Sequence, residues 1–90
     1  MKRLHLQIFG QVQGVGFRFN CSRQARSLGL TGWVRNLPDD SVEIVAEGSP
    51  AALQALSDWC RNGPTFADVE RVTETTGPAL GEFKAFEITD

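Results

Sequence analysis

Apolar and polar residues alternate near the start of the chain, between Arg3 and Phe9. The apolar positions within this stretch are Leu4, Leu6 and Ile8, and the polar ones are His5 and Gln7. A period of two is typical of a β-strand with one buried face. The pattern therefore predicts a first strand over these residues, ended by Gly10.

A helical spacing follows a glycine-bearing stretch at residues 10–16. Four apolar residues then lie four, four and three positions apart, namely Phe17, Cys21, Ala25 and Leu28. This spacing places them on one face of a helix. Gly29 stands where a helix C-cap belongs, so we expect a helix from about residue 17 to residue 28.

Strand and turn signals alternate toward the middle of the chain. Residues 30–35 include Trp33 and Val34, whose bulk favours a strand, and residues 36–41 are rich in turn formers. Apolar and acidic residues alternate in the segment 42–47. The two strands are therefore predicted to form a hairpin.

A second amphipathic helix is indicated after the hairpin. Ser49 is a suitable N-cap, and Pro50 is a suitable first helical residue. The apolar positions of this helix are Ala52, Leu53, Leu56, Trp59 and Cys60, and Asn62-Gly63-Pro64 ends the pattern. Residues 69–75 and 83–88 predict a fourth and a fifth strand.

The order of these elements indicates the fold class. It predicts an α+β fold, a ferredoxin-like βαββαβ sandwich with two helices on one face of a mostly antiparallel sheet, plus a short additional C-terminal strand. We expect one domain over residues 1–90, and the place of the fifth strand in the sheet stays open. Right-handed crossovers make the first two strands parallel, with the third between them. The loop 13–18 and Asn36 are therefore expected at the same edge of the sheet.

The charge balance narrows the range of partners. The 90 residues include 9 basic and 11 acidic ones, and the net charge of −2 creates no overall positive field that would attract nucleic acid or an anionic membrane. No segment approaches the roughly 18 apolar residues of a membrane span. We therefore expect a cytoplasmic protein that acts as a monomer, and any anion site has to be local.

Residues that often carry metal or redox chemistry are scarce. Cys21 and Cys60 are too few and too far apart for a zinc ribbon or a CxxC motif, and His5 alternates with leucines along a strand. We therefore expect no metal and no cofactor. Antiparallel helices would bring the two cysteines to one end of the sheet, where buried thiols are favoured and a disulfide stays open.

The loop at residues 13–18 has the composition of an anion site. It joins a strand to a helix N-terminus, where unpaired N–H groups and the helix dipole favour negative charge. Gly14 and Gly16 let the backbone approach a ligand closely, and Arg18 offers a planar fork for two phosphate oxygens. Glycines in such a loop are equally compatible with a simple turn.

Two motifs in the chain resemble those of the acylphosphatase family. The first runs from Gly10 to Arg18 and reads G-x-V-Q-G-V-x-F-R, and the second runs from Gly32 to Asn36 and reads G-W-V-x-N. Further similarity is found at Leu28-Gly29-Leu30, Glu47-Gly48, Gly63-Pro64 and Phe86-Glu87-Ile88. The resemblance is specific because two separate motifs occur in one short chain.

This resemblance implies an enzyme that hydrolyses small acyl phosphates without a metal. In the family, the arginine that ends the first motif binds phosphate and the asparagine that ends the second orients water; here these are Arg18 and Asn36. The phosphate-binding residues that it implies are Gln13, Gly14, Val15, Gly16, Phe17 and Arg18. The chemistry agrees, because a carboxylate leaving group whose acid has a pKa of about 4 needs no general acid. Phosphoryl transfer itself depends mainly on positioning and charge stabilisation.

Other interpretations stay open at this point. Arg18 is also explained as a surface charge and Asn36 as a turn former, while Asp39 and Asp40 are better turn residues than a base or magnesium ligands. The same fold hosts non-catalytic anion-binding modules and domains fused to carbamoyl-phosphate-using maturation enzymes, although we expect no room in this chain for the partners of the latter. RNA binding is disfavoured, because the strand 42–47 carries acidic and aliphatic residues instead of aromatic ones. The residues leave the acyl group of the substrate open.

Overall fold

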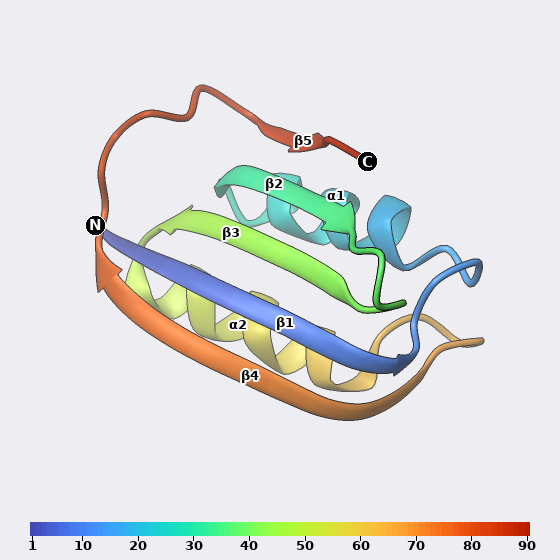
Figure 1. The fold of residues 1–90 in the computed structure, drawn as a ribbon. Helices are drawn as coiled ribbons and strands as arrows, with labels where there is room; N and C mark the ends of the chain where they lie inside the picture. Colours follow the sequence, from blue (N-terminus) through green and yellow to red (C-terminus); the bar gives the residue numbers. More distant parts are fainter.

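The computed structural model describes all 90 residues and contains two helices and one five-stranded sheet (Figure 1). The elements in chain order are β1 (Lys2–Gln11), α1 (Phe17–Ser27), β2 (Thr31–Asn36), β3 (Val42–Gly48), α2 (Pro50–Asn62), β4 (Asp68–Pro78) and β5 (Phe86–Ile88). The strands are arranged in the order β4-β1-β3-β2-β5, and only the pair β2 and β5 is parallel. The predicted fold class is confirmed.

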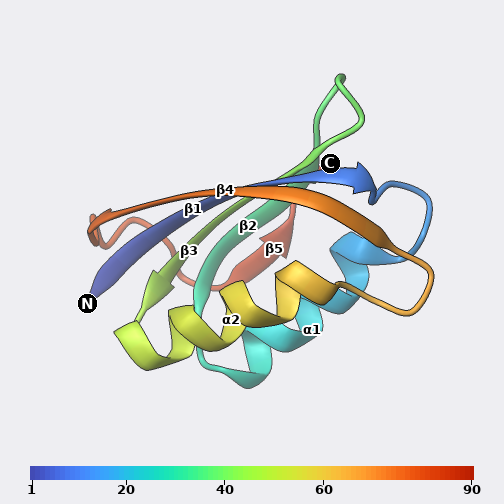
Figure 2. The same cartoon turned by 90° about the horizontal axis from the view of Figure 1, so that it is seen from below.

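Both helices cover the same face of the sheet, and the other face is open (Figure 2). The alternation in β1 explains this arrangement, because its apolar positions face the helices: Leu6 lies opposite Ile44 of β3, and neither is exposed to solvent. The helices meet them with Phe17, Cys21 and Ala25 from α1 and Leu53, Leu56 and Cys60 from α2. Each fully buried aliphatic or aromatic side chain of this core contributes about 2 kcal/mol through its removal from water.

Gly10 does not end the first strand. β1 continues to Gln11, and its register with β4 shifts between Phe9 and Gly10, which marks a β-bulge. Gly10 has a φ of 129°, and a Cβ atom there would lie 2.1 Å from the carbonyl oxygen of Asp68. The glycine is therefore needed for the close approach of β4, and the prediction that it terminates the strand is wrong.

The two edge strands differ in length from the prediction. β4 is longer than the predicted 69–75, because it is an edge strand whose side chains are mostly exposed and backbone pairing with β1 sets its extent. β5 is limited to three residues and lies in parallel beside β2. The Gly32 N–H donates to the Ala85 carbonyl and the Thr89 N–H to the Val34 carbonyl, both at 3.0 Å. The C-terminal strand thus forms the edge next to β2.

Charged side chains fix the segment that leads to β5. Glu47 is 4% exposed, and its carboxylate accepts hydrogen bonds from the N–H groups of Leu80 and Gly81 at 2.9 and 3.1 Å. The Leu80 N–H, together with that of Gly81 and the nearby Arg3 guanidinium, holds the pKa of Glu47 below its ordinary value. Arg26 of α1 donates two hydrogen bonds to the Phe86 carbonyl. Side chains of the sheet and of helix α1 therefore hold β5 and the segment before it in place.

The hairpin turn and the cysteines have structural roles. The Asp39 carboxylate accepts hydrogen bonds from the hydroxyl and the N–H of Ser41, which lower the pKa of Asp39, and Asp40 has a left-handed φ of 73°. Both aspartates therefore serve the turn. Cys21 and Cys60 are buried free thiols. A hydrogen bond with Cys21 and burial raise the pKa of Cys60.

Candidate active site

The loop between β1 and α1 leaves a run of backbone donors unpaired. Gly14 and Gly16 have left-handed φ angles of 74° and 80°, which a residue with a Cβ atom adopts only with strain. Gly16 is the N-cap of α1, and no side chain caps the helix. The N–H groups of residues 14–19 donate no hydrogen bond to any protein atom. These donors lie at the positive end of the helix dipole, where an anion is stabilised.

Arg18 is the one arginine of the chain without a partner. Each of the other arginines forms an ion pair, a hydrogen bond or a stacking contact with an aromatic ring. The guanidinium of Arg18 forms none of these, although its side chain is half-buried in the first turn of α1. A guanidinium beside unpaired N–H groups, with no carboxylate to neutralise it, favours a phosphate-like anion.

Asn36 ends β2 with an unsatisfied side chain. Its backbone is held by pairing with Val42 of β3 and by a 3.0 Å hydrogen bond from its N–H to the Asp90 carbonyl. Its Oδ1 atom is buried and has no hydrogen-bond partner. A buried acceptor without a donor costs about 1–3 kcal/mol, so this oxygen is suited to accept a hydrogen bond from a small molecule in the adjacent cavity.

One cavity brings these groups together. It has a volume of about 210 Å³ and lies between the start of α1, the end of β2 and β5. Its walls are formed by Val12, Gly14, Gly16, Phe17, Arg18, Phe19, Asn36 and Ile88. Arg18 and Asn36 are 18 positions apart in the sequence, and the parallel direction of β1 and β2 with β3 between them brings both to this edge, as the strand order predicted.

Two of the residues expected to bind phosphate lie outside this cavity. Gln13 and Val15 border a neighbouring hollow on the side of Asp40. The side-chain amide of Gln13 donates to the carbonyls of Leu37 and Ser41, both at 2.9 Å. The Gln13 side chain therefore ties the loop to the hairpin after β2, and only its backbone remains free for a ligand.

Sequence reasoning missed three residues of the cavity wall, Val12, Phe19 and Ile88. Val12 belongs to the first motif but was not assigned to the site. Phe19 lies on the polar side of α1, two positions after the buried Phe17, and its side chain is 61% exposed. A large aromatic residue outside the apolar stripe of a helix was the available signal. Ile88 carried no such signal, because the place of β5 in the sheet was not predicted.

Other polar clusters are internally satisfied. On the open face of the sheet, His5 and Arg35 both contact the Glu43 carboxylate at 2.7 Å. Partial burial opposes ionisation, but the hydrogen bonds from His5 and Arg35 bring the pKa of Glu43 below its ordinary value. No three His, Cys, Asp or Glu side chains lie close enough to hold a metal ion. Neither helix has the length and apolarity that a membrane crossing requires.

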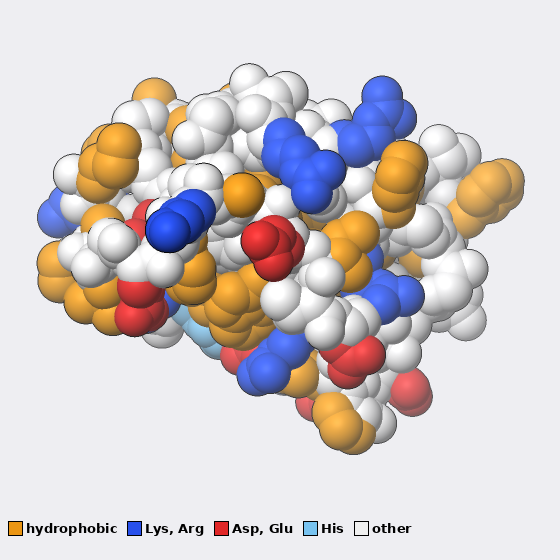
Figure 3. Space-filling view, turned by 90° about the horizontal axis from the view of Figure 1, so that it is seen from above, with side chains coloured by type: hydrophobic (Ala, Val, Ile, Leu, Met, Phe, Trp, Pro, Cys, Tyr) orange, Lys and Arg blue, Asp and Glu red, His pale blue; other side chains and the backbone are white.

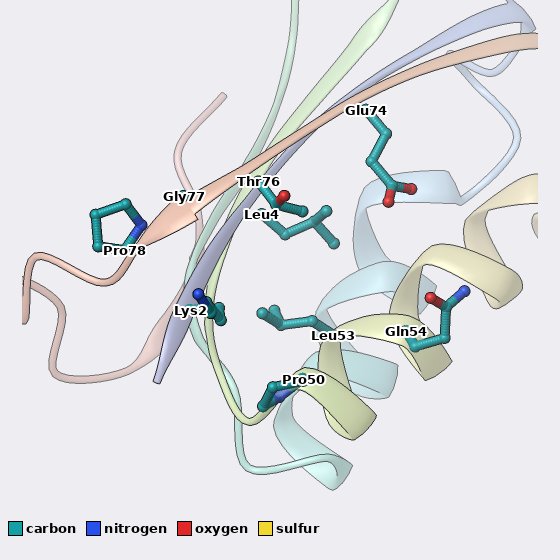
Figure 4. Close-up of a pocket in the computed structure, with 9 residues that line it drawn as sticks. All are labelled: Lys2, Leu4, Pro50, Leu53, Gln54, Glu74, Thr76, Gly77 and Pro78. Atoms are coloured by element: carbon teal, nitrogen blue, oxygen red, sulfur yellow. The ribbon is translucent and has the colours of Figure 1, made fainter.

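A second cavity of about 350 Å³ lies between α2 and the strands β1 and β4 (Figure 4). Leu4 and Leu53 form its floor, and Lys2 and Gln54 lie at its rim. The Glu74 carboxylate on its wall already accepts hydrogen bonds from the side chains of α2 residues Ser57 and Arg61. No residue of this cavity has a buried polar atom without a partner, in contrast to Asn36, so we place the candidate active site at Arg18 and Asn36.

Known proteins resemble this chain in sequence and in fold. The family model described as Acylphosphatase matches residues 4–88. The chain belongs to the acylphosphatase family. It is 53% identical over 89 residues to the acylphosphatase of Marinobacter nauticus, across 99% of this chain and 97% of the relative. Its class of enzyme is therefore that of hydrolases acting on acyl phosphates.

Solved structures show the same fold. The crystal structure of an acylphosphatase from Bacillus subtilis superposes with a TM-score of 0.96 at 37% identity, and the match covers 100% of both chains. The acylphosphatase structure from Coxiella burnetii gives a TM-score of 0.91 at 34% identity, over 98% of this chain and 92% of the other. The resemblance inferred from the two sequence motifs is thus confirmed at the level of family and fold.

Proposed function

We propose that the chain hydrolyses the bond between carboxyl and phosphate groups in acyl phosphates, by attack of a water molecule that Asn36 orients on a phosphate that Arg18 holds. One observation carries this proposal: Asn36, whose buried Oδ1 atom has no hydrogen-bond partner, lines the same small cavity as Arg18, whose guanidinium is unpaired. An anion-binding module needs only the arginine and the loop. The buried acceptor gives a reason for a water molecule beside the anion.

Substrate binding follows from the unpaired donors. The phosphate accepts hydrogen bonds from the N–H groups of the loop 14–19 and two from the Arg18 guanidinium. These donors are fixed by the left-handed glycines and by the Gln13 tether before any ligand arrives. Preorganised donors stabilise the charge that develops on the phosphoryl oxygens without reorganising during the reaction. All of them come from one chain, so we propose that a monomer is competent.

The chemical step needs little more than alignment. Asn36 Oδ1 accepts a hydrogen bond from water, which turns the lone pair of the water oxygen toward phosphorus. The new P–O bond forms as the P–O bond to the carboxylate breaks, and a phosphate oxygen of the substrate takes the proton of the water. The products are a carboxylate and inorganic phosphate. No acid is required, because the leaving carboxylate is a weak base with a conjugate acid of pKa about 4.

Replacement of Asn36 tests the water-positioning role. We expect Asn36→Ala to lower kcat for acetyl phosphate or benzoyl phosphate about a hundredfold with little change in KM, because water loses its alignment while phosphate binding remains. Asn62→Ala, at the exposed end of α2, is the matched control and should retain full kcat. Full kcat in Asn36→Ala contradicts the assigned role.

Assays of the wild-type protein distinguish an enzyme from an anion-binding module. A folded chain that binds inorganic phosphate but hydrolyses neither acyl phosphate is a binding module, and the proposed function is then wrong. Folding is checked by circular dichroism, and phosphate binding by the phosphate-dependent rise in unfolding temperature.

We further propose that hydrolysis needs no metal ion. The guanidinium and the backbone donors supply the positive charge that a metal supplies in other phosphoryl-transfer enzymes. Dialysis against a chelator is expected to leave kcat unchanged, measured with acetyl phosphate before and after treatment. A loss of activity that magnesium restores contradicts this part of the proposal.

A further inference from the structure

Large apolar side chains are rarely exposed on this protein, and two of them border the candidate active site. The exposed ones are Met1, Phe19, Phe66, Leu80 and Ile88. Seen from the β5 edge, apolar side chains are interspersed with basic and acidic ones (Figure 3). Phe19 and Ile88 nevertheless line the same cavity as Arg18 and Asn36, and they are 61% and 43% exposed. Their exposed surface is available to a ligand at the site.

The two side chains reach the cavity from different elements. Phe19 projects from the first turn of α1, next to Arg18, and Ile88 projects from β5, in register with Val34 of β2. The Arg23 guanidinium lies 5.9 Å from the centre of the Phe19 ring, and this cation–π contact favours a defined ring position. Phe19 and Ile88 thus form two apolar walls of a site in which Arg18 and the N–H groups of the loop are the proposed phosphate ligands.

The geometry of phosphoryl transfer tells which part of the substrate meets these walls. The attacking and leaving oxygens lie roughly in line through phosphorus. With the water at Asn36, the acyl group therefore lies on the side of the phosphate away from Asn36. Phe19 comes from α1, across the cavity wall from β2, whereas Ile88 lies on the strand beside β2. A phosphate alone makes no use of either apolar side chain.

We propose that Phe19 and Ile88 form an acyl-binding site, which makes the chain selective for acyl phosphates that carry an apolar or aromatic acyl group over acetyl phosphate. This inference rests on the proposed function, and it assigns Phe19 and Ile88 as specificity-determining residues. Because of the in-line geometry, Phe19 makes the larger contribution and Ile88 the smaller. Contact with a phenyl or alkyl group removes apolar surface of both partners from water, an advantage that acetyl phosphate lacks.

The test compares the kcat/KM values for benzoyl phosphate and acetyl phosphate. In the wild-type chain the ratio of these two values is expected to favour benzoyl phosphate. Phe19→Ala should lower the ratio about tenfold, because much of the contact with the phenyl group is lost, and Ile88→Ala should lower it less. The intrinsic reactivities of the two substrates are the same in every variant, so they cancel when ratios are compared between variants.

Phe66→Ala is the matched control. Phe66 is 81% exposed and lines none of the cavities, so its removal should leave the ratio at the wild-type value. Phe19→Leu, which keeps an apolar side chain, should give a ratio between those of the wild type and Phe19→Ala. A merely structural role of Phe19 lowers both kcat/KM values equally and leaves the ratio unchanged.

The possible results separate this inference from the proposed function. A ratio that falls in Phe19→Ala but not in Phe66→Ala supports the acyl-binding site. An unchanged ratio in Phe19→Ala, with both substrates hydrolysed by the wild type, overturns the acyl-binding site and leaves the proposed function intact. Hydrolysis of neither substrate by the folded wild type overturns the proposed function and the inference together.

Discussion

The two helices begin in opposite ways. At α2, the Ser49 side chain accepts a hydrogen bond from the Ala52 N–H at 3.2 Å, and Pro50 has no N–H that needs a partner. At α1, the cap is Gly16, no side chain takes part, and the first-turn N–H groups are unpaired. The sequence of α2 thus caps its own N-terminus, whereas the N–H groups at the start of α1 have no partner within the chain.

The other ends of the helices are alike, which makes the difference at the N-termini informative. Each helix has an arginine in its last turn, Arg26 in α1 and Arg61 in α2, and neither has an acidic residue in its first turn. Opposite charge at a helix end is a common source of stability. Neither helix start has this charge stabilisation, but only the start of α1 also lacks a side-chain cap, and it is the start that borders the cavity with Asn36. The contrast distinguishes a helix built for support from one built for binding.

Removal of Arg18, at the uncapped start of α1, should have the largest effect on activity. We expect Arg18→Ala to lower kcat/KM for acyl phosphates about a thousandfold and to weaken inhibition by inorganic phosphate, because a charged bidentate donor is lost. Arg71→Ala, which removes an arginine that stacks on Phe9 of the sheet, is the control and should retain activity. Equal inhibition by phosphate in wild type and Arg18→Ala argues against a phosphate contact.

Two glycines with nearly the same backbone conformation allow the effect of backbone strain on stability to be distinguished from an effect on activity. Gly16 and Gly29 have φ angles of 80° and 72°, at the start and just after the end of α1. Alanine at either position should lower the free energy of unfolding by about 1–2 kcal/mol, because a Cβ atom disfavours this conformation. Only Gly16→Ala should also lower kcat/KM, by about a hundredfold, since it displaces the donors of the loop.

Chemical denaturation and acyl phosphate hydrolysis, measured on both variants, test this prediction. If Gly29→Ala loses as much activity as Gly16→Ala at temperatures where both are folded, the backbone of the loop has no special role.

The smallest effect is expected at the capped start of α2, where only stability should change. Ser49→Ala should lower the free energy of unfolding by about 1 kcal/mol through loss of the N-cap hydrogen bond. Its kcat and KM should equal those of the wild type, because α2 lines none of the candidate active site. The measurements are urea denaturation and steady-state kinetics. Changed kinetic constants in this variant mean that the two helix starts are not independent.

Most of the fold was predictable because periodicity reports one-sided burial. The alternation around Leu6 and the helical spacing from Phe17 gave β1 and α1, and the strand order then brought Arg18 and Asn36 to one edge. Edge strands carry a weaker signal. β4 exposes most of its side chains and β5 has three residues, so their limits depend on backbone pairing that side-chain patterns do not record.

The motifs predicted Arg18 and Asn36 as a pair, and the structure brings both to one cavity. The roles of Gln13 and Gly10 depend on partners distant in the sequence. Gln13 contacts the hairpin after β2, and Gly10 accommodates the carbonyl of Asp68. Long-range contacts of this kind have no local pattern. For the same reason, Ile88 could not be assigned to the cavity before the position of β5 was known.

The pairing of Asn36 with the segment after β5 links the candidate active site to the opening of a short edge strand. The N–H of Asn36 is bound to the carbonyl of Asp90, which follows a strand of only three residues. Short elements at the edge of a sheet open locally at a lower free energy than the core. Native-state hydrogen exchange at the Asn36 amide is therefore expected to follow the opening of β5 and not global unfolding, and low denaturant concentrations are expected to disturb this asparagine while the helices and the other strands are still intact.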